Sequence, residues 1–477
     1  MNLEKEFDVL IIGAGLSGLM TACVCAKEGL DVLVLESSFE KDYLCNSRLT
    51  GGIFHLAFHG LYEDEAVIYE TAMKVTNGFA DQALLKVIVE DAKRAVDILR
   101  SLGIPFIRNG GELWQGRVLA PPVLPKLDRQ WKGRAGDIML RTLEVRLSEF
   151  NGSILRGHRV GKILMKDGNY VGLSGAMNRS KTDSESWCIY SKSVVIADGG
   201  FQANLEDLKK YISPYPVNMV QRNAKTGIGD GIRIAKEIGA SLIGLDKFYG
   251  HVLSRDALHN DQLWPYPWVD ELSRTCIVLN PQGERFVDEG FGGVHIANAL
   301  AKLSDPASAI VVFDHEAWLG PARQRALSTN PFLVKAGATV WSALNLEELA
   351  LLAGVPAVSL SRSITQYNAA IDSENLHSLI PSRSTQSYPA LKIQTPPFYA
   401  IPVTPGITYT MGGIKIDSFS RVLDEHDKVI SGVYAVGSTT GGLEGGDFSG
   451  YIGGLCKAAV TGLRAGEHII NKLQLEN

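Results

Sequence analysis

The sequence predicts an α/β fold, and the order of motifs near its start carries that prediction. The apolar run 9–12 (VLII) precedes a glycine-rich stretch, Gly13–Gly18 (GAGLSG), and a second apolar run at 33–35 ends at Glu36. This order is typical of a buried strand, a tight turn, a helix and a second, parallel strand. The chain therefore begins with a Rossmann-like βαβ unit.

The same stretch predicts that this unit binds a dinucleotide. Glycines without side chains let the backbone approach a pyrophosphate, which then lies at the positive amino end of the helix. A carboxylate at the end of the second strand can accept hydrogen bonds from both ribose hydroxyls. The residues expected to contact the dinucleotide are Gly13, Gly15, Leu16, Ser17, Gly18 and Glu36.

Hydrophobic periodicity predicts the elements that follow. Helical spacing of apolar residues is found in segments 81–102, 137–150, 230–239 and 454–473. Alternation of polar and apolar residues, or a short apolar run, predicts strands within 152–195, 412–417 and 432–437. Because glycines cluster beside several of these strands, we expect separate segments to converge on one extended ligand.

The stretch 247–399 departs from this regular order. It is rich in proline and mixes strand-like with helical patterns. We therefore expect an inserted α+β domain, the cap domain, over these residues. The dinucleotide-binding domain would then consist of residues 1–246 and 400–477.

Composition and charge exclude several classes of protein. The net charge of −5 gives no reason to expect nucleic acid as a partner. No apolar stretch approaches the roughly 20 residues that span a bilayer, and the first strand begins too early for a secretory signal before it. The six cysteines form no CxxC pair, which argues against zinc and iron–sulfur sites. We expect a cytoplasmic protein with neither a membrane span nor a metal.

Seven motifs occur in an order that resembles a known family. They are GAGLSG at 13–18 with Glu36, TGG at 50–52 after Ser47, ADGGF at 197–201, GDGI at 229–232, GERFVDE at 283–289, TMGG at 410–413 and GSTTGG at 437–442. Over essentially the whole chain, these motifs are similar to the flavoprotein superfamily of fumarate reductase, succinate dehydrogenase and 3-ketosteroid dehydrogenases. The resemblance implies FAD as the cofactor, wrapped by these loops, under a mobile cap domain.

The resemblance also implies which further residues contact FAD. They are Ser47, Thr50, Gly51, Gly52, Val160, Ala197, Asp198, Gly199, Asp230, Gly437, Glu444, Gly445, Tyr451 and Ile452. Cys45 lies near the position at which succinate dehydrogenases carry a covalent flavin linkage on histidine. We expect a buried, inert thiol there, and FAD bound without a covalent bond.

The sequence departs from the fumarate reductases at the positions that hold their substrate. Those enzymes carry a histidine just before TMGG and an arginine before the last glycine pair, where this chain has Tyr409 and Tyr451. Their proton-donating arginine has no counterpart in His315–Trp318, which follows Phe313-Asp314. Because these cationic groups clamp the dicarboxylate and protonate the product carbon, their absence disfavours fumarate reduction.

Tyrosines at these two positions resemble the 3-ketosteroid dehydrogenases. Tyr451 with Gly453 and Gly454 matches their pattern of a phenol beside a backbone N–H. The resemblance implies α,β-dehydrogenation of a ketone, in which a base removes the α-proton and the β-hydrogen leaves as hydride to flavin N5. A phenol and an amide N–H stabilise the enolate oxygen. Tyr409 and Tyr451 are both candidates for the base and for the oxyanion donor.

Further candidate residues lie in the cap domain and near the flavin loop. His251 is expected to be the base or a carboxylate ligand, with a hydrogen-bonded loop histidine as the alternative. Tyr249 is a candidate catalytic residue or a packing aromatic, and Arg48 is a second candidate for a carboxylate. Aromatic residues spaced by prolines predict either a wall for a ring-shaped substrate or the cap core; they are Trp264, Tyr266 and Trp268.

Together these features predict FAD-dependent desaturation of a cyclic ketone. The substrate would be a small ring such as an oxocyclohexanecarboxylate, or a 3-ketosteroid, and the electron acceptor would be oxygen, a quinone or a redox protein. One alternative is an FAD-dependent reductase of an enoate or fumarate-type alkene. The other is a flavin-binding protein without catalysis, against which the two tyrosines argue.

Overall fold

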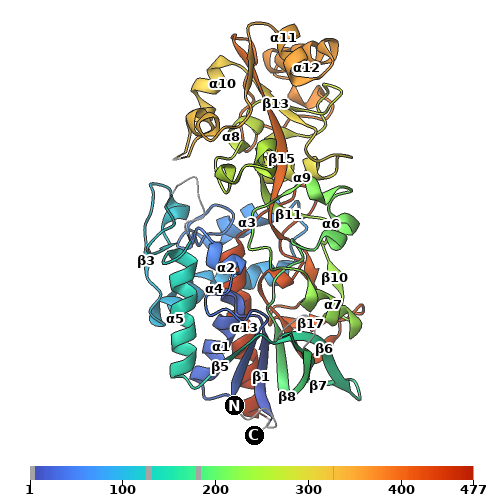
Figure 1. Cartoon of the computed structure of the whole chain (residues 1–477). Helices are drawn as coiled ribbons and strands as arrows, with labels where there is room; N and C mark the ends of the chain where they lie inside the picture. Colours follow the sequence, from blue (N-terminus) through green and yellow to red (C-terminus); the bar gives the residue numbers. More distant parts are fainter. Residues whose placement is uncertain (1–5, 125–130, 179–183, 326, 476–477) are drawn as a thin grey trace.

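The computed structural model describes residues 6–124, 131–178, 184–325 and 327–475. Figure 1 shows an elongated molecule. The strands near both chain ends lie at one end of it, and helices α11 (Leu346–Ala353) and α12 (Ala357–Asp372) lie at the other.

A mainly parallel sheet forms the core of the first part. Its strands, in spatial order, are β17 (Arg421–Leu423), β18 (Val429–Ala435), β8 (Ser184–Ile196), β1 (Phe7–Ile12), β2 (Val32–Glu36) and β5 (Ser153–Arg156). β1 lies between β2 and β8, parallel to both, and its apolar residues are buried. A strand covered on both faces reads as a continuous apolar run, which explains VLII. The α/β fold with a Rossmann-like unit is confirmed.

Helices cover this sheet (Figure 1). α1 (Leu16–Lys27) packs along the last helix, α13 (Gly454–Leu475), where Thr21 Oγ1 donates to the carbonyl of Gly462 over 2.8 Å. A Cβ on Gly462 would lie 2.5 Å from the Ser17 carbonyl oxygen, so glycine permits this close approach. The other helices of this part are α2 (Asn46–Leu49), α3 (Glu65–Val75), α4 (Gln82–Ser101), α5 (Ala135–Glu149), α6 (Leu205–Tyr211) and α7 (Asp230–Glu237).

The predicted elements are confirmed with small shifts at their ends. The four predicted helices correspond to α4, α5, α7 and α13, and each end differs by at most two residues. The predicted meander contains β5 and the antiparallel strands β6 (Arg159–Lys166), β7 (Asn169–Asn178) and β8. Residues 412–417 contribute only the short strand β16 (Gly413–Ile414), paired with β10 (Leu242–Ile243). Within the described ranges, no helix combines the length and apolar character needed to cross a membrane.

A second sheet forms the other part. It contains β11 (Phe248–Ser254), β15 (Phe398–Thr410), β13 (Ile310–Phe313) and β12 (Ile277–Leu279) in that order, with β14 (Trp341–Ala343) and β9 (Val220–Gln221) also paired to β15. Its nearby helices include α8 (Asp270–Ser273), α9 (Gly293–Ala301) and α10 (His315–Leu319). β15 crosses residue 400 and β9 precedes residue 247, so this sheet extends beyond 247–399. The domain boundaries stay a prediction.

β15 connects the second sheet to the glycine loop that follows it. It pairs antiparallel with β11, and the register sets Tyr249 opposite Tyr409. The strand ends at Thr410, directly before the loop Met411–Gly413. This pairing brings two sequence-predicted residues together at the boundary between the two parts.

Candidate active site

A cavity of about 2160 Å³ extends from the glycine turn of the first part to the second sheet. An ordinary ligand pocket holds roughly 300–1,000 Å³, so this cavity has room for a dinucleotide and a separate substrate. Of the predicted dinucleotide contacts, its wall includes Gly13, Gly15, Ser17, Glu36, Ser47, Thr50, Gly51, Gly52, Val160, Ala197, Asp198, Gly199, Asp230 and Tyr451. Those not in its wall are Leu16, Gly18, Gly437, Glu444, Gly445 and Ile452.

The glycine turn has the close packing that its motif predicts. Gly13 has a φ of 98°, and a Cβ there would lie 2.8 Å from the Ala197 carbonyl oxygen. A Cβ on Gly18 would lie 2.2 Å from the Gly13 carbonyl oxygen. The N–H of Leu16 donates to Ser47 Oγ over 3.0 Å. Leu16 and Gly18 therefore shape the turn from behind instead of facing a ligand.

Two carboxylates, the buried Glu36 and the partly buried Asp198, hold the loops around the glycine turn. Glu36 accepts from the backbone N–H of Ala14 at 3.3 Å and of Ser38 at 2.9 Å, and burial raises its pKa. Asp198 accepts from the N–H of Gly231 at 2.7 Å, and burial raises its pKa to about 6. The Asp198 contact joins the segment after β8 to the GDGI motif, and the Glu36 contact joins the end of β2 to the glycine turn.

Glu444 organises the opposite end of the cavity from behind its wall. Tyr409 donates its hydroxyl to both oxygens of this fully buried carboxylate, at 3.0 and 2.9 Å. The N–H groups of Ile452 and Gly453 each donate to Oε1 at 3.0 Å, and Lys457 Nζ lies 3.9 Å from Oε2. The predicted residues Glu444, Ile452 and Gly453 therefore fix the loop before α13, and the Tyr409 proton is already used.

Three side chains form a hydrogen-bonded chain that ends in the cavity. His251 Nδ1 lies 2.6 Å from Asp270 Oδ2, and His251 Nε2 lies 3.2 Å from the Tyr249 hydroxyl. Asp270 also accepts from the N–H of Val252 at 2.8 Å. Trp268 stacks on the His251 ring with centroids 3.7 Å apart. All three members line the cavity.

Burial sets the protonation of this chain. Burial lowers the pKa of His251 to about 4, outweighing the opposite effect of Asp270. Burial raises the pKa of Tyr249 to about 12, although the nearby Arg222 charge acts in the other direction. Because a carboxylate only accepts, His251 donates Nδ1–H to Asp270 and leaves Nε2 to accept from the Tyr249 hydroxyl. In this state Nε2 of His251 is the atom that can accept a proton through Tyr249.

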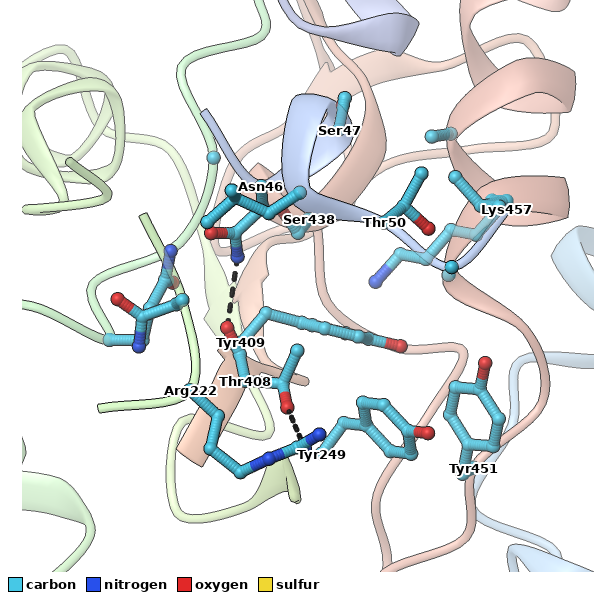
Figure 2. A pocket seen from close by; sticks show the side chains of 18 of the residues that line it. Asn46, Ser47, Thr50, Arg222, Tyr249, Thr408, Tyr409, Ser438, Tyr451 and Lys457 are labelled. Carbon is cyan, nitrogen blue, oxygen red and sulfur yellow. Dashed lines mark hydrogen bonds between the residues drawn. The ribbon is translucent and has the colours of Figure 1, made fainter. Parts of the chain in front are cut away.

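Tyr451 lies directly against Tyr249. Their rings stack with centroids 4.0 Å apart, and Figure 2 shows Tyr249, Tyr409 and Tyr451 side by side. The N–H of Gly454 donates to the Tyr451 hydroxyl, and burial raises the pKa of this phenol well above its usual value. Among the described residues, no side chain or carbonyl accepts a hydrogen bond from the Tyr451 hydroxyl, so its proton is available to a ligand. Of the two predicted amides, Gly454 supports Tyr451, whereas Gly453 is taken by Glu444.

The aromatic residues spaced by prolines do line the cavity. Trp264, Tyr266 and Trp268 are all in its wall, and the rings of Tyr266 and Trp268 are 5.0 Å apart. Trp264 also packs with Val220 and Leu253 in a small apolar cluster. All three residues therefore belong to the cavity wall, and Trp264 belongs to an apolar cluster as well.

Arg48 does not occupy the position predicted for it. Its side chain is fully buried in an ion pair with Asp137 of α5, and it also contacts Glu144. It is not part of the cavity wall. The prediction that Arg48 holds a substrate carboxylate is therefore wrong, because a carboxylate distant in sequence already neutralises this cation.

Sequence reasoning missed Asp270 and Arg222, which both line the cavity. Asp270 is 19 residues from His251 on another element, and Arg222 follows the two-residue strand β9. Neither belongs to a motif whose spacing indicates chemistry. Cys45 does line the cavity, but burial raises its pKa to about 12, which agrees with the expected inert thiol.

The residues present fit FAD. The turn Gly13–Gly15 would hold the pyrophosphate, Glu36 the ribose, and the wall from Ser47 to Gly52 the part that approaches the tyrosines. Fold and site together define a flavin-dependent oxidoreductase. A family model described as FAD binding domain matches residues 8–450. The chain belongs to this family, and FAD is its cofactor.

Known proteins similar to this chain carry redox activities in their names. It is 30% identical over 377 residues to NADH:acrylate oxidoreductase of Vibrio harveyi, covering 76% of this chain but only 34% of that protein. It is 28% identical to the probable fumarate reductase Ifc3 of Shewanella frigidimarina, covering 93% and 71% of the two chains. The structure of 3-ketosteroid-Δ4-(5α)-dehydrogenase from Rhodococcus jostii RHA1 superposes with a TM-score of 0.73 at 20% identity, covering 98% of both chains. This last likeness shows a shared fold.

The structural role of Arg48 predicts an effect of its replacement on stability. Arg48→Met leaves the buried Asp137 carboxylate without its main cation, so the free energy of unfolding should decrease by about 3 kcal/mol. The matched control is Arg233→Met, which removes a half-exposed ion pair with Glu237 and should change stability by no more than about 0.5 kcal/mol. Urea unfolding measures both. Unchanged stability of Arg48→Met would contradict this role.

The buried histidines predict a loss of stability in acid. His55, like His251, has its pKa lowered to about 4 by burial, whereas an unfolded histidine titrates near 6.5. The unfolded chain therefore binds protons first, so stability is full above pH 6.5 and decreases as the pH falls toward 4. Each histidine should remove about 2 kcal/mol between pH 6.5 and 5.

Urea midpoints at pH 7 and pH 5 test this loss. The decrease should be smaller in His55→Gln and unchanged in the control His426→Gln, since His426 is exposed. An equal decrease in wild type and His55→Gln would show that His55 is not held neutral by burial.

Proposed function

We propose that this flavoprotein catalyses the α,β-dehydrogenation of a cyclic ketone, a small ring such as an oxocyclohexanecarboxylate in preference to a 3-ketosteroid. The observation that supports this proposal is the chain from Asp270 through His251 to Tyr249, which opens into the cavity beside Tyr451. FAD, when bound, supplies the acceptor for the β-hydride. The electrons then leave for an external acceptor, which is oxygen, a quinone or a redox protein.

Tyr249 is the group placed to remove the α-proton. As its hydroxyl oxygen takes up that proton, its own proton moves to His251 Nε2. The imidazolium that forms is stabilised by Asp270, whose Oδ2 lies 2.6 Å from Nδ1. A phenol with a pKa of about 12 is a strong base once its proton has left, so the relay makes Tyr249 effective at neutral pH.

Tyr451 is the group placed to stabilise the enolate. Its oxygen accepts from the Gly454 N–H, which leaves its own proton for the substrate carbonyl. Since its ring stacks on Tyr249 at 4.0 Å, one small molecule can present its carbonyl oxygen to Tyr451 and its α-carbon to Tyr249. Tyr409 acts as a positioning residue, because its hydroxyl is held by Glu444.

A second candidate function is the reverse reaction, reduction of an activated alkene. The names of the two relatives with the higher identities, which act on acrylate and fumarate, favour it. In that direction Tyr249 would donate a proton to carbon and regain it from a His251 imidazolium. Burial holds His251 neutral at pH 7, which is the protonation state from which the dehydrogenation relay starts.

Removal of single hydroxyls tests the assignment of Tyr249 and Tyr451. Tyr249→Phe and Tyr451→Phe should each lower the rate of anaerobic flavin reduction by 4-oxocyclohexanecarboxylate by about 100- to 10,000-fold. FAD content should stay at the wild-type level. Stopped-flow measurement of the oxidised flavin band gives both quantities.

The control variant is Tyr266→Phe, which removes a hydroxyl from the same cavity but outside the relay. Its rate should stay within a few-fold of wild type. Equal losses in all three variants, or none in Tyr249→Phe, would refute the assigned roles.

A further inference from the structure

Arg222 differs from the other arginines of the second part that line the cavity, because it has no carboxylate partner among the described residues. Arg222 lines the cavity, and its Nε is buried without a hydrogen-bond partner among the described residues. Its NH1 group donates to Thr408 Oγ1 over 2.9 Å, a neutral acceptor. In the described part of the chain, no carboxylate forms an ion pair with it. Burial lowers the pKa of Arg222, yet a guanidinium stays charged at neutral pH.

Each of the two neighbouring arginines already has a carboxylate partner. Arg274 and Arg325 line the same cavity, and both form ion pairs with Glu271. Asp270, the other acid nearby, is used by His251. Arg222 is partly buried, and its Nε is fully buried, so a bound anion would supply the counter-charge that Arg222 lacks among the described residues.

Arg222 also lies beside the reacting groups. Its Cζ is 5.3 Å from the centre of the Trp268 ring, and that ring stacks on His251. Its acceptor Thr408 directly precedes Tyr409, and Figure 2 shows the guanidinium next to Thr408 and Tyr249. An anion bound there would belong to a molecule that reaches Tyr249. Neither Tyr409 nor Tyr451, which stand where fumarate reductases carry their cations, supplies this charge.

We propose that Arg222 binds a carboxylate of the substrate, so that the enzyme selects an anionic ring ketone over a neutral one. This inference deepens the proposed function and rests on it for the site at which the ring lies. A guanidinium presents two N–H groups in a plane that matches a carboxylate, and such charge-assisted pairs fix orientation as well as affinity. Trp268 and Tyr266 provide the apolar surface for the ring.

Binding of two ring probes to the FAD-loaded protein tests this role without turnover. Benzoate carries the carboxylate, and benzyl alcohol is its neutral counterpart; flavin difference spectra report both. Arg222→Gln should weaken benzoate binding by about 10- to 100-fold, because a hydrogen-bonded charge pair is lost. Benzyl alcohol binding should change less than about threefold, and Arg222→Lys should restore part of the benzoate affinity.

The control is Arg325→Gln, which removes a cavity cation already paired with Glu271 and should leave benzoate binding near wild type. The proposal is overturned if wild type does not bind benzoate, if Arg222→Gln binds it normally, or if both probes weaken equally. If benzoate binding depends on Arg222 but no ring ketone reduces the flavin, the carboxylate site stands and dehydrogenation fails.

Discussion

The pairing of β15 with β11 is the interaction on which the site depends. One long strand joins four strands of the second sheet and then runs directly into the TMGG loop of the first part. Its register sets Tyr409 opposite Tyr249, and His251 follows two residues later on the same face of β11. A shift of one residue would turn these side chains to the other face. The chemistry is therefore positioned by backbone pairing and not by a flexible loop.

Burial then decides what each polar group can do. Glu444 accepts hydrogen bonds from Tyr409, Ile452 and Gly453, and these hydrogen bonds fix the loop before α13. Asp270 holds one tautomer of His251, and the apolar surroundings keep that histidine neutral. Groups satisfied in this way support the site, whereas Tyr451 and Arg222 keep hydrogen-bonding capacity for a ligand. Because of this division we assign different roles to two tyrosines with similar motif positions, Tyr409 and Tyr451.

Motifs made of residues close together in the sequence could be predicted, whereas contacts between residues far apart in the sequence could not. The turn at Gly13–Gly18 and the acid Glu36 were predictable because a pyrophosphate and a ribose require those residue types at that spacing. The role of Arg48 was mispredicted because its partner Asp137 lies on a helix far along the chain. Arg222 gave no signal, since only the fold shows that its Nε is buried without a hydrogen-bond partner among the described residues.

The most direct test of ketone desaturation is anaerobic mixing of the wild-type flavoprotein with 4-oxocyclohexanecarboxylate, followed by the absorbance of oxidised flavin and analysis of the product. Dehydrogenation predicts that the flavin band bleaches in one turnover and that the corresponding enone forms. If no cyclic ketone bleaches the flavin, while an enoate reoxidises the chemically reduced protein, the enzyme is a reductase and the central claim is wrong.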